Sequence, residues 1–166
     1  MSGIVGVVLA GGLARRMGGG DKPMTEIAGR PMLDHVVERL GAQVDAMVLN
    51  ANGDPQRFAA WNLPVVADSI EGFAGPLAGV LAGLEWAAVH RPEARAVVSV
   101  AGDTPFFPTD LVKRFDAATN HDITAIALAA SKGYAHPVFG LWPVECADDL
   151  RAFLEAGERR ERFWRS

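Results

Sequence analysis

The residues best suited to chemistry lie near the start of the chain, where glycines and cations are concentrated. Residues 9–22 read LAGGLARRMGGGDK and place Arg15, Arg16 and Lys22 among glycines. A glycine-rich backbone can turn its N–H groups toward an anion at close range. Arginine and lysine side chains supply the counter-charge that a polyphosphate needs. This stretch predicts a binding loop for a small anionic ligand; the alternative is a flexible loop with solvated arginines.

Two common nucleotide-binding motifs do not fit this loop. A Walker A motif requires Gly-Lys-Ser/Thr, whereas Lys22 stands between Asp21 and Pro23. A dinucleotide fingerprint requires Gly-x-Gly-x-x-Gly, which residues 11–15 do not provide. The next expected strand ends in Asn50 rather than in an acidic residue that could bind a ribose. The loop therefore indicates another class of phosphate-binding site.

The elements that must hold this loop follow from the spacing of apolar residues. Continuous apolar runs predict buried strands at residues 3–9, 45–50, 63–67, 96–101, 123–129 and 137–142. Apolar residues every three or four positions predict helices at residues 31–40, 76–89, 108–118 and 144–156. Strands separated by helices imply βαβ units and a mainly parallel sheet with both faces covered. In such sheets ligands bind at the carboxyl ends of the strands, and the glycine-rich loop follows the first strand.

Length and composition fit one soluble globular domain. The chain has 166 residues, 49% hydrophobic and 22% charged, which excludes disordered, collagen-like and low-complexity classes. The net charge of −4 argues against a nucleic-acid binder. Cys146 is the only cysteine, so an internal disulfide is excluded. The apolar residues 3–10 are too few to span a membrane. Arg15 and Arg16 follow this stretch, whereas the basic residues of a secretory signal precede its apolar stretch, so we expect a cytoplasmic protein.

The string LAGGLARRMGGGDKP resembles the signature loop of the molybdenum cofactor guanylyltransferases, also called molybdopterin-guanine dinucleotide synthases. Those enzymes belong to a wider group of nucleotidyltransferases, and the resemblance implies their Rossmann-like three-layer α/β/α fold with a mainly parallel central sheet. Gly11 and Gly12, together with Gly-Gly-x-Asp-Lys, favour the guanylyl branch. The related cytidylyl enzymes usually show Leu-Ala-Ala-Gly.

Further stretches agree with the family in order along the chain. They lie at residues 48–52, 68–69 with 75–79, 102–106, 135–138 and 154–160. The resemblance therefore covers nearly the whole sequence. Members usually continue with a further strand, an Asn-x-Asn-Thr-Pro-type motif and a terminal helix. We expect residues 1–166 to form a single nucleotidyltransferase domain without that C-terminal strand and helix.

The resemblance implies a role for each residue of the motifs. Asp103 would bind magnesium, and Arg16 and Lys22 would stabilise charge on the α-phosphate and on the leaving pyrophosphate. Asn50 and Asp68 would bind the base or the ribose. Further contacts to the nucleotide would come from Leu9, Ala10, Gly11, Gly12, Gly75, Pro76, Leu77 and Gly79.

Three residues of these motifs have a structural alternative. Asp103 could be a turn aspartate that bonds its own backbone, as is common in Asp-x-Pro sequences. Asn50 could be a polar cap at the end of a strand. His136 lies where the family places its second substrate, and a structural role is the alternative.

The reaction that the resemblance implies is transfer of GMP from GTP to the phosphate of the molybdenum-molybdopterin cofactor, with release of pyrophosphate. Mg²⁺ would be the metal. The alternatives are a molybdopterin cytidylyltransferase, a sugar-phosphate nucleotidyltransferase, or a nucleotide-binding module without catalysis. We expect molybdenum-cofactor delivery proteins or molybdoenzyme chaperones as protein partners, no nucleic acid, no membrane, and a monomer or weak oligomer.

Overall fold

The fold is described from a computed structural model, which covers residues 3–10, 22–70, 75–120, 122, 124–131 and 134–156. Side chains are described over the same ranges except at residues 22, 131 and 134–137.

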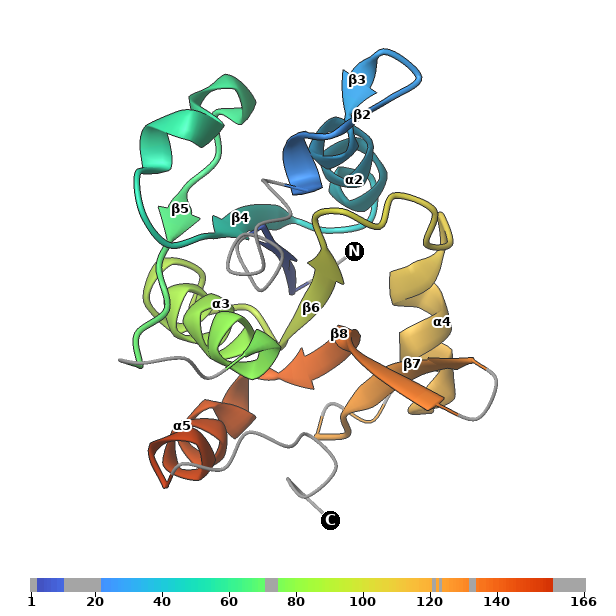
Figure 1. The fold of residues 1–166 in the computed structure, drawn as a ribbon. Helices are drawn as coiled ribbons and strands as arrows, with labels where there is room; N and C mark the ends of the chain where they lie inside the picture. The colour runs from blue at the N-terminus through green and yellow to red at the C-terminus, as the bar shows by residue number, and fades with distance from the viewer. Residues whose placement is uncertain are drawn as a thin grey trace.

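A six-stranded sheet forms the centre of the molecule (Figure 1). In spatial order its strands are β5 (Val65–Val66), β4 (Ala46–Asn50), β1 (Ile4–Leu9), β6 (Ala96–Ala101), β8 (Tyr134–Pro143) and β7 (Ala127–Ser131). The first four strands run parallel, β8 is antiparallel to β6, and β7 is antiparallel to β8. The sheet is thus mainly parallel, as the sequence predicts.

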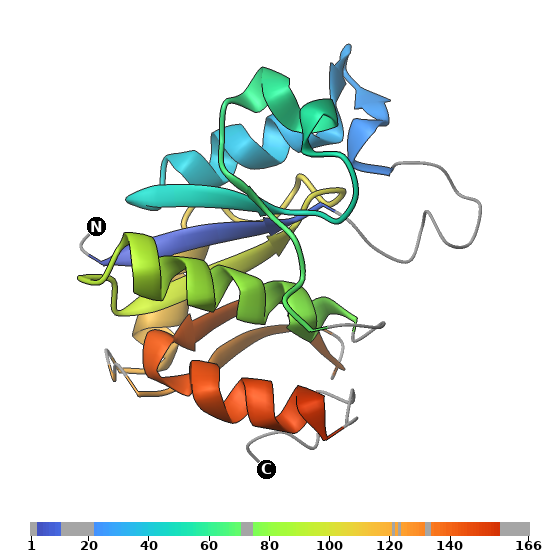
Figure 2. The ribbon, with the colours of Figure 1, turned by 90° about the vertical axis from the view of Figure 1, so that its left-hand side faces the viewer.

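Helices cover both faces of this sheet and give three layers. Helices α2 (Met32–Gly41) and α4 (Leu111–Ala118) pack on one face, in one apolar cluster with Ile4 and Val98. Helices α3 (Pro76–His90) and α5 (Ala147–Glu155) pack on the other face, with Val5 and Val97. Figures 1 and 2 show α3 and α5 side by side. Because neighbouring residues of β1 and β6 enter opposite clusters, both strands are apolar except for Ser99, whose hydroxyl accepts from the Trp142 indole at 3.0 Å.

Short elements surround the core. The 3₁₀ turn η1 (Lys22–Met24) leads into a hairpin of β2 (Glu26–Ile27) and β3 (Arg30–Pro31), closed by Ala28 and Gly29 at positive φ. Two more 3₁₀ segments, η2 (Pro55–Trp61) and η3 (Val144–Cys146), follow β4 and β8. The hairpin and η2 were not predicted, since two-residue strands and 3₁₀ turns carry no extended periodicity.

Several predicted boundaries need correction. The strand expected at residues 123–129 is found at Ala127–Ser131, and the strand expected at 63–67 is only Val65–Val66. The helix expected from residue 108 begins at Leu111, because the Leu111 N–H turns back to the Pro108 carbonyl at 3.2 Å. Apolar residues such as Leu63 and Ile126 lie outside the two observed strands, so the apolar pattern alone misplaces the limits of those strands.

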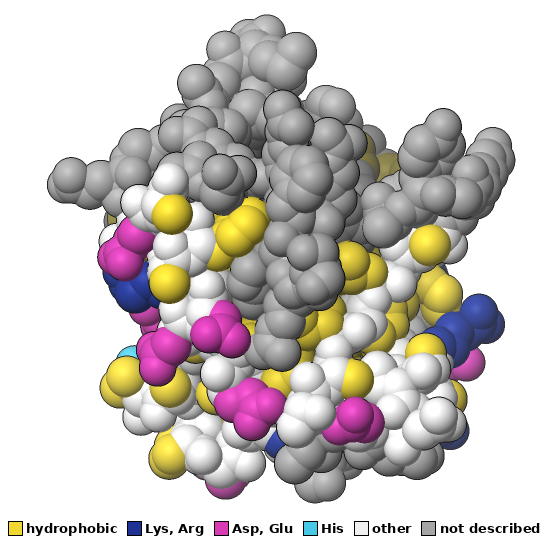
Figure 3. Space-filling view, turned by 90° about the horizontal axis from the view of Figure 1, so that it is seen from below, with side chains coloured by type: hydrophobic (Ala, Val, Ile, Leu, Met, Phe, Trp, Pro, Cys, Tyr) yellow, Lys and Arg dark blue, Asp and Glu magenta, His cyan; other side chains and the backbone are white. Residues whose placement is uncertain are grey.

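Among the described residues, the helices are too short or too polar to cross a membrane. Figure 3 shows one face of the molecule, on which Asp and Glu side chains are scattered and Lys and Arg side chains are isolated. The described part of that face therefore carries no continuous basic patch.

Candidate functional site

Three strands end side by side at the carboxyl edge of the sheet. Leu9, the last residue of β1, is in register with Asn50 of β4 and Ala101 of β6. The Ala10 N–H donates to the Asn50 carbonyl at 2.9 Å, and the Gly102 N–H donates to the Leu9 carbonyl at 3.0 Å. The chain leaves β1 toward β4 on one side, while β6 lies on the other. This edge is the topological switch point where ligands of doubly wound sheets bind.

Asn50 and Asp68 are joined at this edge by side-chain hydrogen bonds. The Asn50 amide donates to an Asp68 carboxylate oxygen at 2.9 Å and to the Val66 carbonyl at 3.2 Å. The other Asp68 oxygen accepts from the Asn52 amide at 3.2 Å, and the Asp68 N–H donates to Asn52 Oδ1 at 2.9 Å. Asn50 is only 6% exposed, so these bonds fix its orientation. Asn50 therefore does cap the strand end, and it also holds Asp68 at the edge.

Helix α3 begins at the same edge and approaches Asn50 closely. A Cβ built on Gly79 would lie 2.7 Å from Leu9 Cδ2 and closer still to Asn50 Oδ1, so only glycine fits there. Gly75, which precedes the helix, has φ 72° and ψ −161°, a conformation that glycine adopts readily. Pro76 follows at the first helical position, where its missing N–H costs nothing. The amino end of the 15-residue helix α3 thus lies at the carboxyl edge of the sheet, where the helix dipole favours binding of an anion.

Pro76, Leu77 and Gly79 form the first turn of α3 rather than a separate pocket loop. The Leu77 side chain is fully buried in the core with Val5 and Val48. Leu77 can therefore offer a ligand only its backbone.

Asp103 lies at the third strand end, directly after β6 and Gly102. Its carboxylate is partly exposed and accepts a 3.3 Å hydrogen bond from the Thr104 hydroxyl. Within the described part of the chain, no backbone N–H donates to this carboxylate, so the turn-aspartate interpretation lacks its defining bond. Gly102 packs tightly, because an added Cβ would lie 3.3 Å from the Leu9 carbonyl oxygen.

The donor set at this edge fits Mg²⁺. Over residues 3–10, 22–70, 75–120, 122, 124–131 and 134–156, no group of three or more His, Cys, Asp or Glu side chains could hold a metal ion. Mg²⁺ needs only one or two carboxylates when phosphate oxygens and waters complete its shell. Asp103 offers one carboxylate at the sheet edge where a triphosphate would lie.

Some predicted residues lie outside the described part of the chain. Gly11, Gly12 and Arg16 belong to residues 11–21, which are not described. Lys22 begins η1, and its side chain is also outside the description. Its neighbour Pro23 packs beside Gly102, because a Cβ on Gly102 would meet Pro23 Cγ at 3.4 Å. The backbone at Lys22 is thus close to the strand end that carries Asp103.

The hairpin after η1 is anchored by charge. Arg30 donates to Asp34 at 3.0 Å and to Glu38 at 3.1 Å, both on α2. The Trp61 indole of η2 also donates to Asp34 at 2.7 Å. The bond from Arg30 and the bond from Trp61 hold the pKa of Asp34 below its usual value, although partial burial opposes this. These contacts fix β3 and η2 to α2.

The model of the MobA-like NTP transferase domain family matches residues 6–166. The chain belongs to this family. The molybdenum cofactor guanylyltransferase of Bradyrhizobium sp. (strain ORS 278) is 60% identical over 158 residues, which cover 95% of this chain and 74% of the relative. A protein of the same name from Rhodopseudomonas palustris (strain BisB5) is 57% identical over 155 residues, 93% of this chain and 74% of the relative.

Solved structures share the fold of this MobA-like domain. Molybdopterin-guanine dinucleotide biosynthesis protein A from Archaeoglobus fulgidus superposes with a TM-score of 0.73 at 20% identity, over 94% of this chain and 75% of that chain. A putative protein from Aquifex aeolicus VF5 gives a TM-score of 0.71 at 24% identity, over 94% of this chain and 78% of that one. The predicted Rossmann-like nucleotidyltransferase fold is thereby confirmed.

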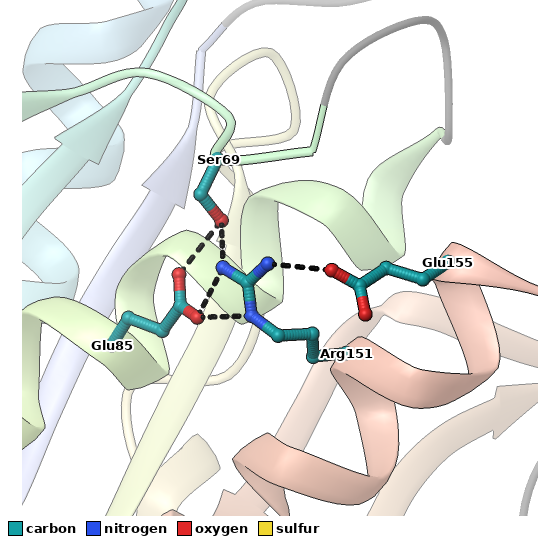
Figure 4. A network of polar contacts seen from close by, with 4 residues as sticks. All are labelled: Ser69, Glu85, Arg151 and Glu155. Atoms are coloured by element: carbon teal, nitrogen blue, oxygen red, sulfur yellow. Dashed lines mark hydrogen bonds and ion pairs between the residues drawn. The ribbon is translucent and has the colours of Figure 1, made fainter.

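The sequence did not reveal the residues that hold Asp68 in place. Asn52 lies in the stretch VLNAN, for which the resemblance implies a role only at Asn50. Ser69, Glu85 and Arg151 form a polar network next to Asp68 (Figure 4), and Arg151 is 66 positions from Glu85. No local spacing signal could have indicated a contact at that separation.

Proposed function

We propose that this MobA-like domain transfers GMP from GTP to the terminal phosphate of the molybdenum-molybdopterin cofactor and releases pyrophosphate. The observation that carries the proposal is the 60% identity, over 95% of this chain, to a relative named molybdenum cofactor guanylyltransferase. The arrangement of Asn50, Asp68, Asp103 and the amino end of α3 at one sheet edge supports it.

The transfer is an in-line displacement at phosphorus. An oxygen of the cofactor phosphate forms a bond to the α-phosphorus of GTP, while the bond from that phosphorus to the α,β-bridging oxygen breaks. Pyrophosphate leaves with the bonding electrons. The attacking phosphate is already anionic, so no general base is needed. The protein's task is therefore positioning and charge stabilisation.

Different residues at the carboxyl edge of the sheet bind different parts of GTP in this proposal. Asn50 and Asp68 bind the base or the ribose, and the first turn of α3 shapes the guanine pocket. Arg16 and Lys22 neutralise charge on the α-phosphate and on the leaving pyrophosphate. The backbone contacts come from Leu9, Ala10, Gly11, Gly12, Gly75, Pro76, Leu77 and Gly79.

Asp103 would hold Mg²⁺ against the triphosphate oxygens. Bound there, the ion would offset the negative charge that develops on pyrophosphate as it leaves. The Gly102 N–H donates to the Leu9 carbonyl, so Asp103 directly follows a residue that is held beside the start of the glycine-rich loop.

Pyrophosphate release tests the proposal. The purified chain is supplied with molybdopterin, molybdate and Mg²⁺, together with GTP, CTP or ATP in separate reactions. We expect release with GTP that requires both the cofactor and Mg²⁺. Release with CTP alone would indicate a cytidylyltransferase. Binding of GTP by calorimetry without any release would indicate a nucleotide-binding module.

A further inference from the structure

A polar network joins the segment after Asp68 to two helices (Figure 4). Ser69 follows Asp68 in the chain, Glu85 lies in the middle of α3, and Arg151 and Glu155 lie on α5. Arg151 donates to one Glu85 oxygen from Nε at 2.9 Å and from Nη2 at 2.6 Å. It also donates from Nη1 to Glu155 at 3.0 Å. One guanidinium therefore connects α5 to α3.

Ser69 closes this network from the loop side. Its hydroxyl donates to the second Glu85 oxygen at 2.7 Å and accepts from Arg151 Nη2 at 3.0 Å. Arg151 carries the permanent charge of an arginine guanidinium, and its bonds to Glu85 and Glu155 raise its pKa further. The Arg151 and Glu85 side chains are 34% and 35% exposed, so the pair is partly shielded from water. Because Glu85 and Arg151 are partly shielded and bonded to each other, they orient the Ser69 hydroxyl more firmly than fully solvated side chains would.

Residues 68 and 69 are thus held from two sides. Asn50 and Asn52 of the β4 end hold Asp68, and Glu85 and Arg151 hold Ser69. Loss of the second set would leave the peptide between Asp68 and Ser69 anchored on one side only. The Asp68 carboxylate would then sample more orientations, and Asn50 would lose a fixed acceptor.

We infer that Ser69, Glu85 and Arg151 are positioning residues that set the orientation of Asp68 for the nucleoside end of GTP. The inference rests on the proposed function, in which Asp68 binds the base or ribose. The three residues act through Asp68 and are given no contact with the nucleotide.

The network is separable from the packing of the two helices. Helices α3 and α5 already share an apolar cluster that includes Leu81, Leu84, Leu150 and Leu154, all buried. Removal of the polar contacts leaves that cluster intact. A positioning role therefore predicts a change in ligand affinity that exceeds the change in folding stability.

The test compares GTP with inorganic tripolyphosphate, which has the phosphates but lacks base and ribose. Calorimetry in Mg²⁺ gives the Kd of each ligand for wild type, Ser69→Ala, Glu85→Gln and Arg151→Met. We expect the Kd for GTP to rise about fivefold in each variant, the scale of one partly shielded polar contact. The Kd for tripolyphosphate should stay unchanged, and Arg151→Lys should recover part of the GTP affinity.

Arg95→Met is the matched control. Arg95 pairs with Asp116 of α4 at 3.3 Å with side chains 32% and 24% exposed, and it precedes β6 at the opposite edge of the sheet. It should leave both Kd values unchanged. Urea unfolding checks that each variant is folded, and Ser69→Ala, at an exposed position, keeps the test valid if the charge variants are unstable.

The outcomes separate the inference from the proposed function. If wild type binds GTP and the variants bind it equally well, the positioning role is overturned and the proposed function stands. The same holds if the variants lose affinity for GTP and for tripolyphosphate in parallel. Wild type that fails to bind GTP overturns the proposed function and the inference with it. In the double variant Ser69→Ala, Glu85→Gln, the Kd for GTP should rise by less than the product of the two single fold-changes, since both residues act through one network. A rise equal to that product would contradict the inference.

Discussion

The side-chain amide of Asn50 donates a 2.9 Å hydrogen bond to the carboxylate of Asp68, although 18 positions separate the two residues. The Asn50 carbonyl meanwhile accepts from the Ala10 N–H at 2.9 Å, where the glycine-rich loop begins. One residue thus links the start of that loop to the segment that carries Asp68. The proposed phosphate and nucleoside ends of the site share this anchor.

Asn50→Asp should weaken GTP binding more than Asn50→Ala does. The new carboxylate would lie beside the Asp68 carboxylate, and the repulsion between the two would displace Asp68. We expect about a tenfold rise in the Kd for GTP, the effect of losing one hydrogen bond to a charged group. Calorimetry measures this, with Asn50→Ala for comparison. Gln56→Ala, on the exposed segment η2, should bind GTP like wild type; an equal loss there would argue for a general effect.

An alanine at Gly79 should lower the stability of the protein. The new methyl group would overlap Leu9 and Asn50, so α3 or Asn50 must shift. We expect a loss of about 1–3 kcal/mol in the free energy of unfolding, as for other overpacked sites. Urea denaturation checks this. Gly41→Ala, at the end of α2, meets only Met47 Cε at 3.4 Å among described atoms and should be neutral or slightly stabilising. Similar losses in both variants would contradict the close-packing account.

Asp103→Asn should abolish turnover without unfolding the protein. The amide keeps the shape of the side chain but removes the charge that would hold Mg²⁺. We expect pyrophosphate release to fall by about 100-fold or more, as when one strong electrostatic contact to a transition state is lost. Asp110→Asn is the control, since Asp110 pairs only with Arg114 among described residues and is 48% exposed. Unchanged turnover in Asp103→Asn would remove Asp103 from the metal site.

The Asp34 contacts should give a defined pH dependence of stability. Because the folded state lowers the pKa of Asp34, its ion pair stabilises the protein above the usual aspartate pKa near 3.9 and is lost as the pH falls through the lowered value. Wild type should therefore be more stable than Asp34→Asn at pH 7, and the difference should shrink below about pH 4. Urea unfolding across this pH range measures the gap. A gap that grows on acidification would contradict the assignment.

The sequence predicts the parts of this fold that are periodic. Residues of β1 and β6 are apolar except for Ser99 because helices cover both faces of the sheet, and that pattern is visible in the sequence. The hairpin at residues 26–31 depends instead on Ala28 and Gly29 at positive φ and on Arg30 bonding to α2. Contacts of that kind leave no repeat in the sequence.

The site was predictable only as far as local motifs extend. Asn50, Asp68 and Asp103 stand in short stretches that resemble the family, and the structure brings Asn50 and Asp68 into contact. The partners of the neighbouring Ser69 lie on α3 and α5, and Ser69 is 82 positions from Arg151. Only the packing of α3 against α5 brings them together, so no motif could contain them.

Formation of a bond between the α-phosphorus of GTP and an oxygen of the cofactor phosphate defines the proposed reaction. The most direct test supplies GTP labelled at the α-phosphate or, separately, at the γ-phosphate, together with molybdenum-molybdopterin and Mg²⁺. The account predicts that the α label appears covalently attached to molybdopterin and that the γ label appears in pyrophosphate. A γ label on the acceptor, or an α label that never leaves free nucleotide, would contradict it.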